Sequence, residues 1–287
     1  MARTNHSAHP ITALRDTVTS LEASILVCLA APKKEAVHRL RTLTRRIEAQ
    51  LELLALLPGL PRHEQQARNT SRLLKKLRHA AGQVRDIDVQ RDLIRDEAAS
   101  TNCAPPAERD LRQQARNLRS TLKHKRDEAE ADLLRLLHKQ RTQLPLAFEE
   151  LLKTLAPAES LTLTEPQLTA LVRDVYTNHR EPQPAAIPRT TAALHEIRKR
   201  AKLARYLAES APESAKAARR LAARFGSLQQ AGGKWHDWLI LTDIATHEFG
   251  DSAPLPQRFA AQTHTALRAF QRRLRAFSSA DTAKRAA

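Results

Sequence analysis

The chain has 287 residues, of which 28% are charged and only 3% are aromatic. Lysine and arginine number 48 against 31 acidic residues, so the formal net charge is +17. This excess disfavours a compact chain unless an anionic partner screens it, and nucleic acid, an anionic membrane and polyphosphate all qualify. The scarcity of aromatic rings argues against a binder of single-stranded nucleic acid, because such proteins stack bases on aromatic side chains.

The sequence shows no sign of membrane insertion or export. Its apolar runs are too short to span a bilayer, and Met1 to Pro10 lacks the apolar stretch of a signal peptide. Cys28 and Cys103 form no motif and suit small buried side chains in a reducing compartment. We therefore expect a cytoplasmic protein.

Helix is the expected secondary structure throughout, because long runs rich in Ala, Leu, Arg, Glu and Gln dominate and no alternating strand pattern is present. Proline and glycine place most of the helix ends. Gly82 is expected to interrupt one long helix and to mark either a close helix approach or a bend, and Gly226 and Gly232-Gly233 are expected to interrupt another. The expected helices cover residues 12–31, 33–57, 62–99, 105–139, 144–155, 166–176, 190–210, 213–249 and 254–277.

The second expected helix has two contrasting faces. An apolar stripe runs from Val37 to Leu54 at helical spacing. On the other side His38, Arg41 and Arg45 follow one another at i, i+3 and i+7, within roughly 60° of each other. Neighbouring like charges on a helix repel, so this cationic row indicates a polyanion lying along it.

A second cationic row repeats the first one. His195, Arg198 and Lys202 have the same offsets, and Arg205 extends the row by one turn. The row spans roughly 15 Å at the helical rise, which is long enough to meet several phosphates. As neutral imidazoles, His38 and His195 can each donate a hydrogen bond to a phosphate oxygen.

The two halves of the sequence match beyond the rows. Residues 77–86 parallel residues 228–237: in both, Leu precedes Gly by five residues and Asp follows that Gly by four. The histidines of the rows are 157 residues apart and the two aspartates 151 residues apart. This period is too long for a solenoid repeat, so it indicates two similar helical bundles.

Four motifs carry this repeat: His38-x-x-Arg41-x-x-x-Arg45-Arg46, Gly82-x-x-Arg85-Asp86-x-Asp88, His195-x-x-Arg198-x-x-x-Lys202-x-x-Arg205-Tyr206 and Gly233-x-x-His236-Asp237. In this order they resemble the CHAD domain, the conserved histidine α-helical domain. The sequence departs from the family pattern at Glu48, where a cation often stands, and at Leu203, where an arginine is expected.

The resemblance implies an all-α fold of two four-helix bundles of long antiparallel helices, related by a pseudo-twofold axis. It covers residues 10–278, with halves at about 10–157 and 158–278 and flexible tails at 1–9 and 279–287. It also implies binding of inorganic polyphosphate in a basic cleft and association with polyphosphate granules.

We expect the polyphosphate site to be lined by the two rows, with Arg72 and Lys75 flanking the first row from the next helix. The candidate binding residues are His38, Arg41, Arg45, Arg46, Arg72, Lys75, His195, Arg198, Lys199, Lys202, Arg205 and Tyr206.

The remaining polar and aromatic motifs favour structural roles. Asp86 and Asp237 are expected to hold cations of a facing helix, rather than to act in acid–base chemistry or bind metal. Trp235 and Trp238 are expected to be core or interface anchors.

Catalysis is not indicated, because the sequence has no metal-binding spacing, no phosphate-binding glycine loop and no nucleophile–base pair. No cofactor is expected. The alternative function is nonspecific nucleic-acid binding, which the poverty of aromatics and the lack of a helix-turn-helix signature disfavour. An enzyme acting on polyphosphate is disfavoured by the missing carboxylate cluster for metal.

Overall fold

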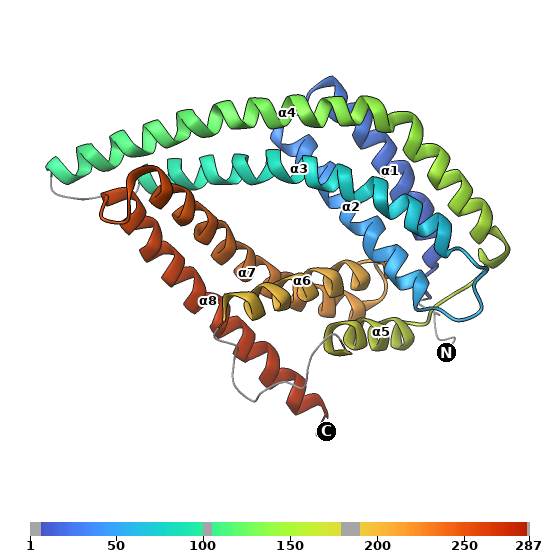
Figure 1. The fold of residues 1–287 in the computed structure, drawn as a ribbon. Helices are drawn as coiled ribbons and strands as arrows, with labels where there is room; N and C mark the ends of the chain where they lie inside the picture. Colours follow the sequence, from blue (N-terminus) through green and yellow to red (C-terminus); the bar gives the residue numbers. More distant parts are fainter. Residues whose placement is uncertain (1–6, 100–104, 179–189, 286–287) are drawn as a thin grey trace. The chain divides into compact units, whose positions relative to one another are not determined.

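The computed structural model describes residues 7–99, 105–178 and 190–285, which form eight α-helices and one short 3-10 helix (Figure 1). Within these residues no strand is formed, and the only β-type pairing is an isolated bridge between Ala8 and Leu163. The expectation of an all-α fold is therefore confirmed. The proline-rich segment from Glu181 to Pro188 lies outside the described residues.

Most helices begin and end within a few residues of their expected positions, although α8 continues well past the end expected at residue 277. The observed bounds are α1 Pro10–Ala30, α2 Lys34–Ala55, α3 Glu64–Ala99, α4 Pro105–Leu155, η1 Ala156–Ala158, α5 Glu165–Asn178, α6 Thr191–Ala208, α7 Lys216–Phe249 and α8 Pro254–Arg285.

Helix α4 corrects the expectation of two separate helices at 105–139 and 144–155. It is one continuous helix with Pro145 inside it, and its yellow-green C-terminal part changes direction (Figure 1). Proline lacks the N–H that would bond the carbonyl of Arg141, which bends a helix without having to end it. Leu144 and Phe148 on either side of Pro145 are fully buried, and their packing keeps the chain helical through the bend.

The glycines inside α7 do not interrupt it, contrary to expectation: α7 continues through Gly226, Gly232 and Gly233, as α3 continues through Gly82. Packing of long helices commonly outweighs the modest helix propensity of glycine. Of the two roles expected for Gly82, the close helix approach is observed, because a Cβ there would be in van der Waals contact with Arg41 of α2 at 3.5 Å. A Cβ at Gly232 would be too close to Phe270, at 3.0 Å.

The chain divides into two compact units, each built from segments that are distant in the sequence. The first unit comprises residues 1–85, 129–181 and 202–225, and the second comprises residues 86–128, 182–201 and 226–287. Helices α3, α4, α6 and α7 each contribute one part to each unit. The pseudo-twofold relation between two four-helix bundles stays a prediction.

In the first unit, α1 packs along α2 (Figure 1). The apolar stripe of α2 faces inward, with Val37 and Leu54 both fully buried. Gln50 is also buried and donates from Nε2 to the Ala13 carbonyl at 3.1 Å and to Thr17 Oγ1 at 3.0 Å. This polar contact fixes how the two helices meet, because a buried amide without a partner is costly.

The N-terminal end of the first unit is more ordered than the sequence indicated. Ala8, expected in a flexible tail, is only 4% exposed and exchanges two backbone hydrogen bonds with Leu163, of 2.7 and 2.9 Å. Cys28 is buried, as expected, whereas Cys103 lies outside the described residues.

The core of the second unit is built on aromatic rings. Trp235 is 2% exposed and stacks on Phe270 at a centroid distance of 5.8 Å, while Trp238 is 4% exposed and meets Phe259 at 5.5 Å. Their expected role as core anchors is confirmed. In the described chain, no helix carries an apolar stretch long enough to cross a bilayer.

The adjacent glycines of α7 allow a matched stability test. A Cβ at position 232 would lie 3.0 Å from the buried Phe270 ring, whereas a Cβ at position 233 would meet nothing within 4 Å. We expect Gly233→Ala to raise the free energy of unfolding by up to about 1 kcal/mol through helix propensity. Gly232→Ala should instead lower it by about 1–2 kcal/mol, because overpacking outweighs the propensity gain. Chemical denaturation of both variants measures the difference, and equal effects would contradict the close approach at Gly232.

Candidate functional site

The first cationic row lies on α2, opposite the buried apolar stripe. His38 and Arg46 are exposed, and Arg41 and Arg45 are half-buried. The row therefore has the orientation that helical spacing predicted. The rigidity of α2 comes from the burial of its other face, so the cations are held in place despite their mutual repulsion.

Helix α3 packs against this row at Gly82. A Cβ at Gly82 would lie 3.5 Å from Nε of Arg41, in van der Waals contact with the guanidinium, so this face of α3 lies directly against the row. One turn earlier on α3, Arg78 Nε donates to Glu48 Oε1 at 2.9 Å. Glu48, which departs from the family pattern, thus holds a cation of the neighbouring helix beside the row.

The cations are crowded enough to shift one another's pKa. The pKa of Arg45 is lowered to about 10, chiefly by burial and also by the neighbouring Arg41 and Arg78, whereas Glu48 and Tyr206 oppose the shift. The buried Nε of Arg45 has no hydrogen-bond partner within the described part of the chain. An arginine kept partly from water beside other cations gains strongly from an anion placed against it.

His38 experiences the same field. Partial burial lowers the pKa of its imidazole, and Arg85, Arg41 and Lys34 lower it further. The neutral ring is therefore favoured in the free protein, and a nearby anion would reverse the electrostatic part of the shift.

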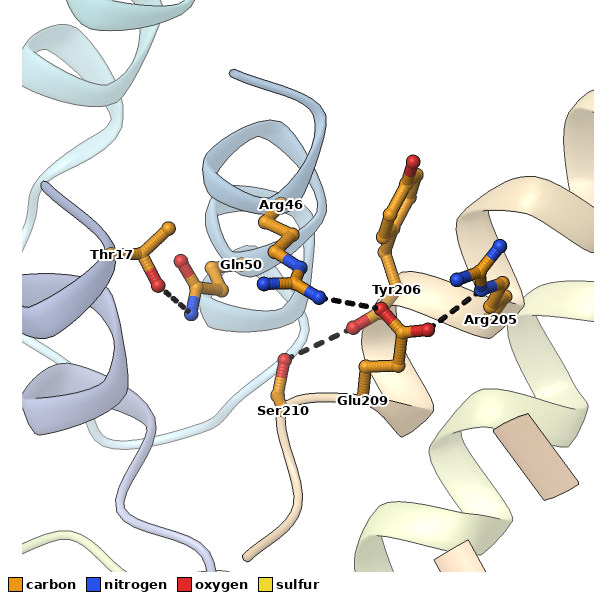
Figure 2. Close-up of polar contacts among 7 residues, drawn as sticks. All are labelled: Thr17, Arg46, Gln50, Arg205, Tyr206, Glu209 and Ser210. Atoms are coloured by element: carbon orange, nitrogen blue, oxygen red, sulfur yellow. Dashed lines mark hydrogen bonds and ion pairs between the residues drawn. The ribbon is translucent and has the colours of Figure 1, made fainter. Parts of the chain in front are cut away.

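The C-terminal part of the second row belongs to the same unit as the first row. Lys202 and Arg205 are half-buried, and Tyr206 is buried. Glu209, at the end of α6, connects the rows: Arg205 Nε donates to its Oε1 at 2.6 Å, and Arg46 Nη2 lies 3.4 Å from its Oε2. Figure 2 shows the Glu209 carboxylate between the two guanidinium groups. The first unit thus brings cations of α2, α3 and α6 together.

The N-terminal part of the second row lies in the second unit. The His195 ring is 4.9 Å from Trp235 and 4.7 Å from the edge-on ring of His236. Partial burial lowers the pKa of His195, and Arg198 and Lys199 lower it further. Lys199 is exposed and forms an ion pair with Glu196 of the preceding turn.

The glycine–arginine contact occurs in both units. A Cβ at Gly232 would lie 3.2 Å from Cγ of Arg198, as one at Gly82 would approach Arg41. Arg41 and Arg198 occupy the same position in their rows, three residues after the histidine. In the second unit, however, the contact falls on Gly232 and not on Gly233, which the motif comparison had selected.

The structure does not bring all the candidate residues to the rows. Arg72 and Lys75 are exposed on α3, and Arg72 Nη2 donates to Asn69 of its own helix at 3.3 Å. Within the described residues, neither makes a hydrogen bond or an ion pair to α2. That all the candidate residues line one groove stays a prediction.

Arg78 and Arg85 are the α3 cations nearest the first row, and the candidate set omitted them. Their spacing could have identified them, because Arg78, Gly82 and Arg85 follow one another at i, i+4 and i+7 and so share one helix face. A glycine on a cationic helix face marks the side where another helix approaches.

The acidic residues of the motifs show one clear structural pair. Asp88 in the second unit is buried, and its Oδ1 lies 3.2 Å from Nε of Arg126. Asp86 is exposed and Asp237 is half-buried, and their pairing with facing cations stays a prediction. Across the described ranges, no group of three His, Cys, Asp or Glu side chains is placed to hold a metal ion.

The sequence profile of the CHAD domain matches residues 12–246, and the chain belongs to this family. No curated protein matches the sequence closely enough to indicate a relationship.

Two solved structures share the fold. PptA from Streptomyces chartreusis is 18% identical, with a TM-score of 0.61 over 93% of this chain and 98% of PptA. The CHAD domain from the plant Ricinus communis is 17% identical, with a TM-score of 0.50 over 93% of this chain and 88% of that one. At these identities the likeness concerns the fold alone.

The electrostatic origin of the His38 shift can be tested by titration. We expect NMR to give His38 a pKa below 6.5, and Arg85→Gln to raise it because one neighbouring cation is lost. Because the folded-state pKa is depressed, this residue lowers stability as pH falls through the unfolded value of about 6.5. Lys76→Gln, on the opposite face of α3, is the control and should leave the His38 titration unchanged. Equal titration curves in all three proteins would contradict the assignment.

Proposed function

We propose that this chain binds inorganic polyphosphate through the cationic rows of α2 and α6, without catalysing a reaction on it. The observation that carries the proposal is the meeting of cations from α2 and α3 around Arg45, whose pKa falls to about 10, with Arg205 of α6 joined to Arg46 through Glu209. Family membership supports it, because CHAD domains are associated with polyphosphate.

The chemistry of the side chains suits a phosphate chain. Polyphosphate offers oxygen acceptors and about one negative charge per unit, but no base edges that could be read. Arginine contributes a planar pair of donors and lysine a mobile point charge, which recognise phosphate without sequence specificity. The first unit supplies both types, with Arg41 and Arg45 on α2 and Lys202 on α6.

A binding role agrees with the family, in which the domain is generally a binding module. We further propose that the protein associates with polyphosphate granules in the cytoplasm by binding the polymer. Duplex nucleic acid is the competing ligand, because the net charge of +17 would attract it as well. Competition between long-chain polyphosphate and duplex DNA, at equal phosphate and fixed salt, separates the two ligands: preference for DNA would reject the proposal.

The site assignment is tested by neutralising one cation on each helix. Arg45→Gln combined with Lys202→Gln should weaken binding of long-chain polyphosphate at least about tenfold, since each lost charge-assisted contact costs roughly 1 kcal/mol or more. Isothermal titration calorimetry at fixed salt measures the loss.

The matched control removes the same charge elsewhere. Lys123 and Lys125 are exposed on α4 in the second unit, so Lys123→Gln with Lys125→Gln should change the affinity little. These lysines are better controls than Arg126, whose guanidinium is paired with the buried Asp88. Equal losses in two folded double variants would mean that net charge alone explains binding.

Binding should also depend steeply on salt. Each phosphate contact displaces condensed counterions, so by analogy with nucleic acid we expect log K to fall against log salt with a slope of roughly 4 to 8. Titrations between low and physiological salt give this slope. A nearly flat dependence would exclude the rows as the binding surface.

A further inference from the structure

Glu209 is an acidic residue placed among the candidate phosphate ligands of the first unit. Its two carboxylate oxygens face different helices, with Oε1 2.6 Å from Nε of Arg205 on α6 and Oε2 3.4 Å from Nη2 of Arg46 on α2 (Figure 2). A carboxylate held between two guanidinium groups presents the same charge and the same acceptor geometry as a phosphate oxygen pair.

We propose that Glu209 is an internal counter-ion that competes with phosphate for Arg46 and Arg205, and thereby makes the site selective for long polyphosphate chains. This inference rests on the proposed function and specifies the ligand class of the same site. Nothing in the family resemblance identifies Glu209, which lies outside the four motifs.

The geometry indicates a displaceable contact. The Arg46 and Arg205 side chains are 45% and 33% exposed, so water and ligands reach both guanidinium groups, whereas the Glu209 side chain between them is 20% exposed. Ion pairs of this exposure contribute little to stability, and the longer one, to Arg46, is at the outer limit of a hydrogen bond. The carboxylate can therefore swing away without unfolding its helix.

Chain length decides the outcome of the competition. Glu209 is tethered one turn from Arg205, so a short phosphate in solution competes with a partner that is always present. A long chain can also bind cations beyond this pair, such as Arg45, and then competes for Arg46 and Arg205 while it is already bound. The carboxylate thus weakens the binding of short anions more than the binding of long ones.

A second acidic residue in this cluster shows the contrasting arrangement. Glu48 pairs with Arg78 at 2.9 Å, and both side chains are only about a quarter exposed or less, at 21% and 26%. Burial is the largest influence on the pKa of Glu48 and raises it, although three cations act in the opposite direction. Glu48 and Glu209 are equally exposed, at 21% and 20%, so the two carboxylates differ in their partners: Arg46 and Arg205 are more exposed than Arg78.

The test compares two probes on two variants. Glu209→Gln removes the charge and keeps the shape of the side chain. We expect it to tighten tripolyphosphate about three- to tenfold, and long-chain polyphosphate less than about twofold, in calorimetric titrations at fixed salt. Glu209→Ala, which also removes the acceptor oxygens, should change the affinity for each probe in the same direction as Glu209→Gln does.

Glu159→Gln is the matched control. Glu159 also pairs with an exposed arginine of the first unit, Arg15 at 2.8 Å, and its loss raises the net charge by the same single unit. It lies outside the rows, so this variant should leave the ratio of the two affinities unchanged. Thermal melting confirms that all three variants are folded.

The remaining outcomes overturn the inference in distinct ways. If Glu209→Gln weakens both probes, Glu209 positions the two arginines and does not compete with phosphate. If it tightens neither probe, or tightens both no more than Glu159→Gln does, Glu209 has no role in selectivity. If the unmodified protein binds no polyphosphate of any length, the proposed function itself is wrong.

Discussion

Repulsion among like charges on helices that cannot move apart is the constraint on which this structure depends. Helix α2 buries its apolar stripe within the first unit, and α3 approaches it at Gly82, where a Cβ would be in van der Waals contact with Arg41. The cations stay close because packing on the opposite face holds them. Burial lowers the pKa values of Arg45 and His38 most, and repulsion from neighbouring cations lowers them further. A polyanion bound along the row would supply countercharge and reduce the repulsion among these cations.

The glycine–arginine contact explains why the second unit resembles the first at its cationic row. The Cβ position of Gly232 lies close to Arg198, as that of Gly82 lies close to Arg41. Each arginine comes three residues after a histidine whose pKa is lowered. The surroundings differ, however. His195 packs against Trp235 and His236, whereas His38 is exposed among cations. Each unit therefore holds its arginine by the same backbone approach while placing its histidine in a different environment.

The helices and the orientation of the first row could be predicted from sequence, because both follow from a periodicity that holds within one helix. The candidate residues that depend on a second helix were harder to predict. Lys75 is one helical turn from Arg78 along α3, yet only Arg78 pairs with a residue of α2, since the contact is decided by where α3 crosses α2. The continuity of α4 through Pro145 could not be predicted for a related reason. A proline usually ends a helix, but the burial of Leu144 and Phe148 keeps α4 continuous. Likewise, the sequence alone does not distinguish Gly232 from Gly233, because the difference depends on Phe270, which packs against Gly232 only.

The acidic residues of the first unit bear on the proposed anion site. Every carboxylate within the cluster reduces the repulsion that a ligand would otherwise relieve, so each one weakens binding as it stabilises the fold. Glu48 and Glu209 differ in how far they stabilise the fold and how far they weaken ligand binding. Glu48 is committed to Arg78 at a packed helix contact, and its charge helps to hold α2 and α3 together. Glu209 follows the last residue of α6, and its partners Arg46 and Arg205 are more exposed than Arg78. The proposed exchange with a polyanion therefore concerns Arg46 and Arg205, while Arg78 stays paired with Glu48.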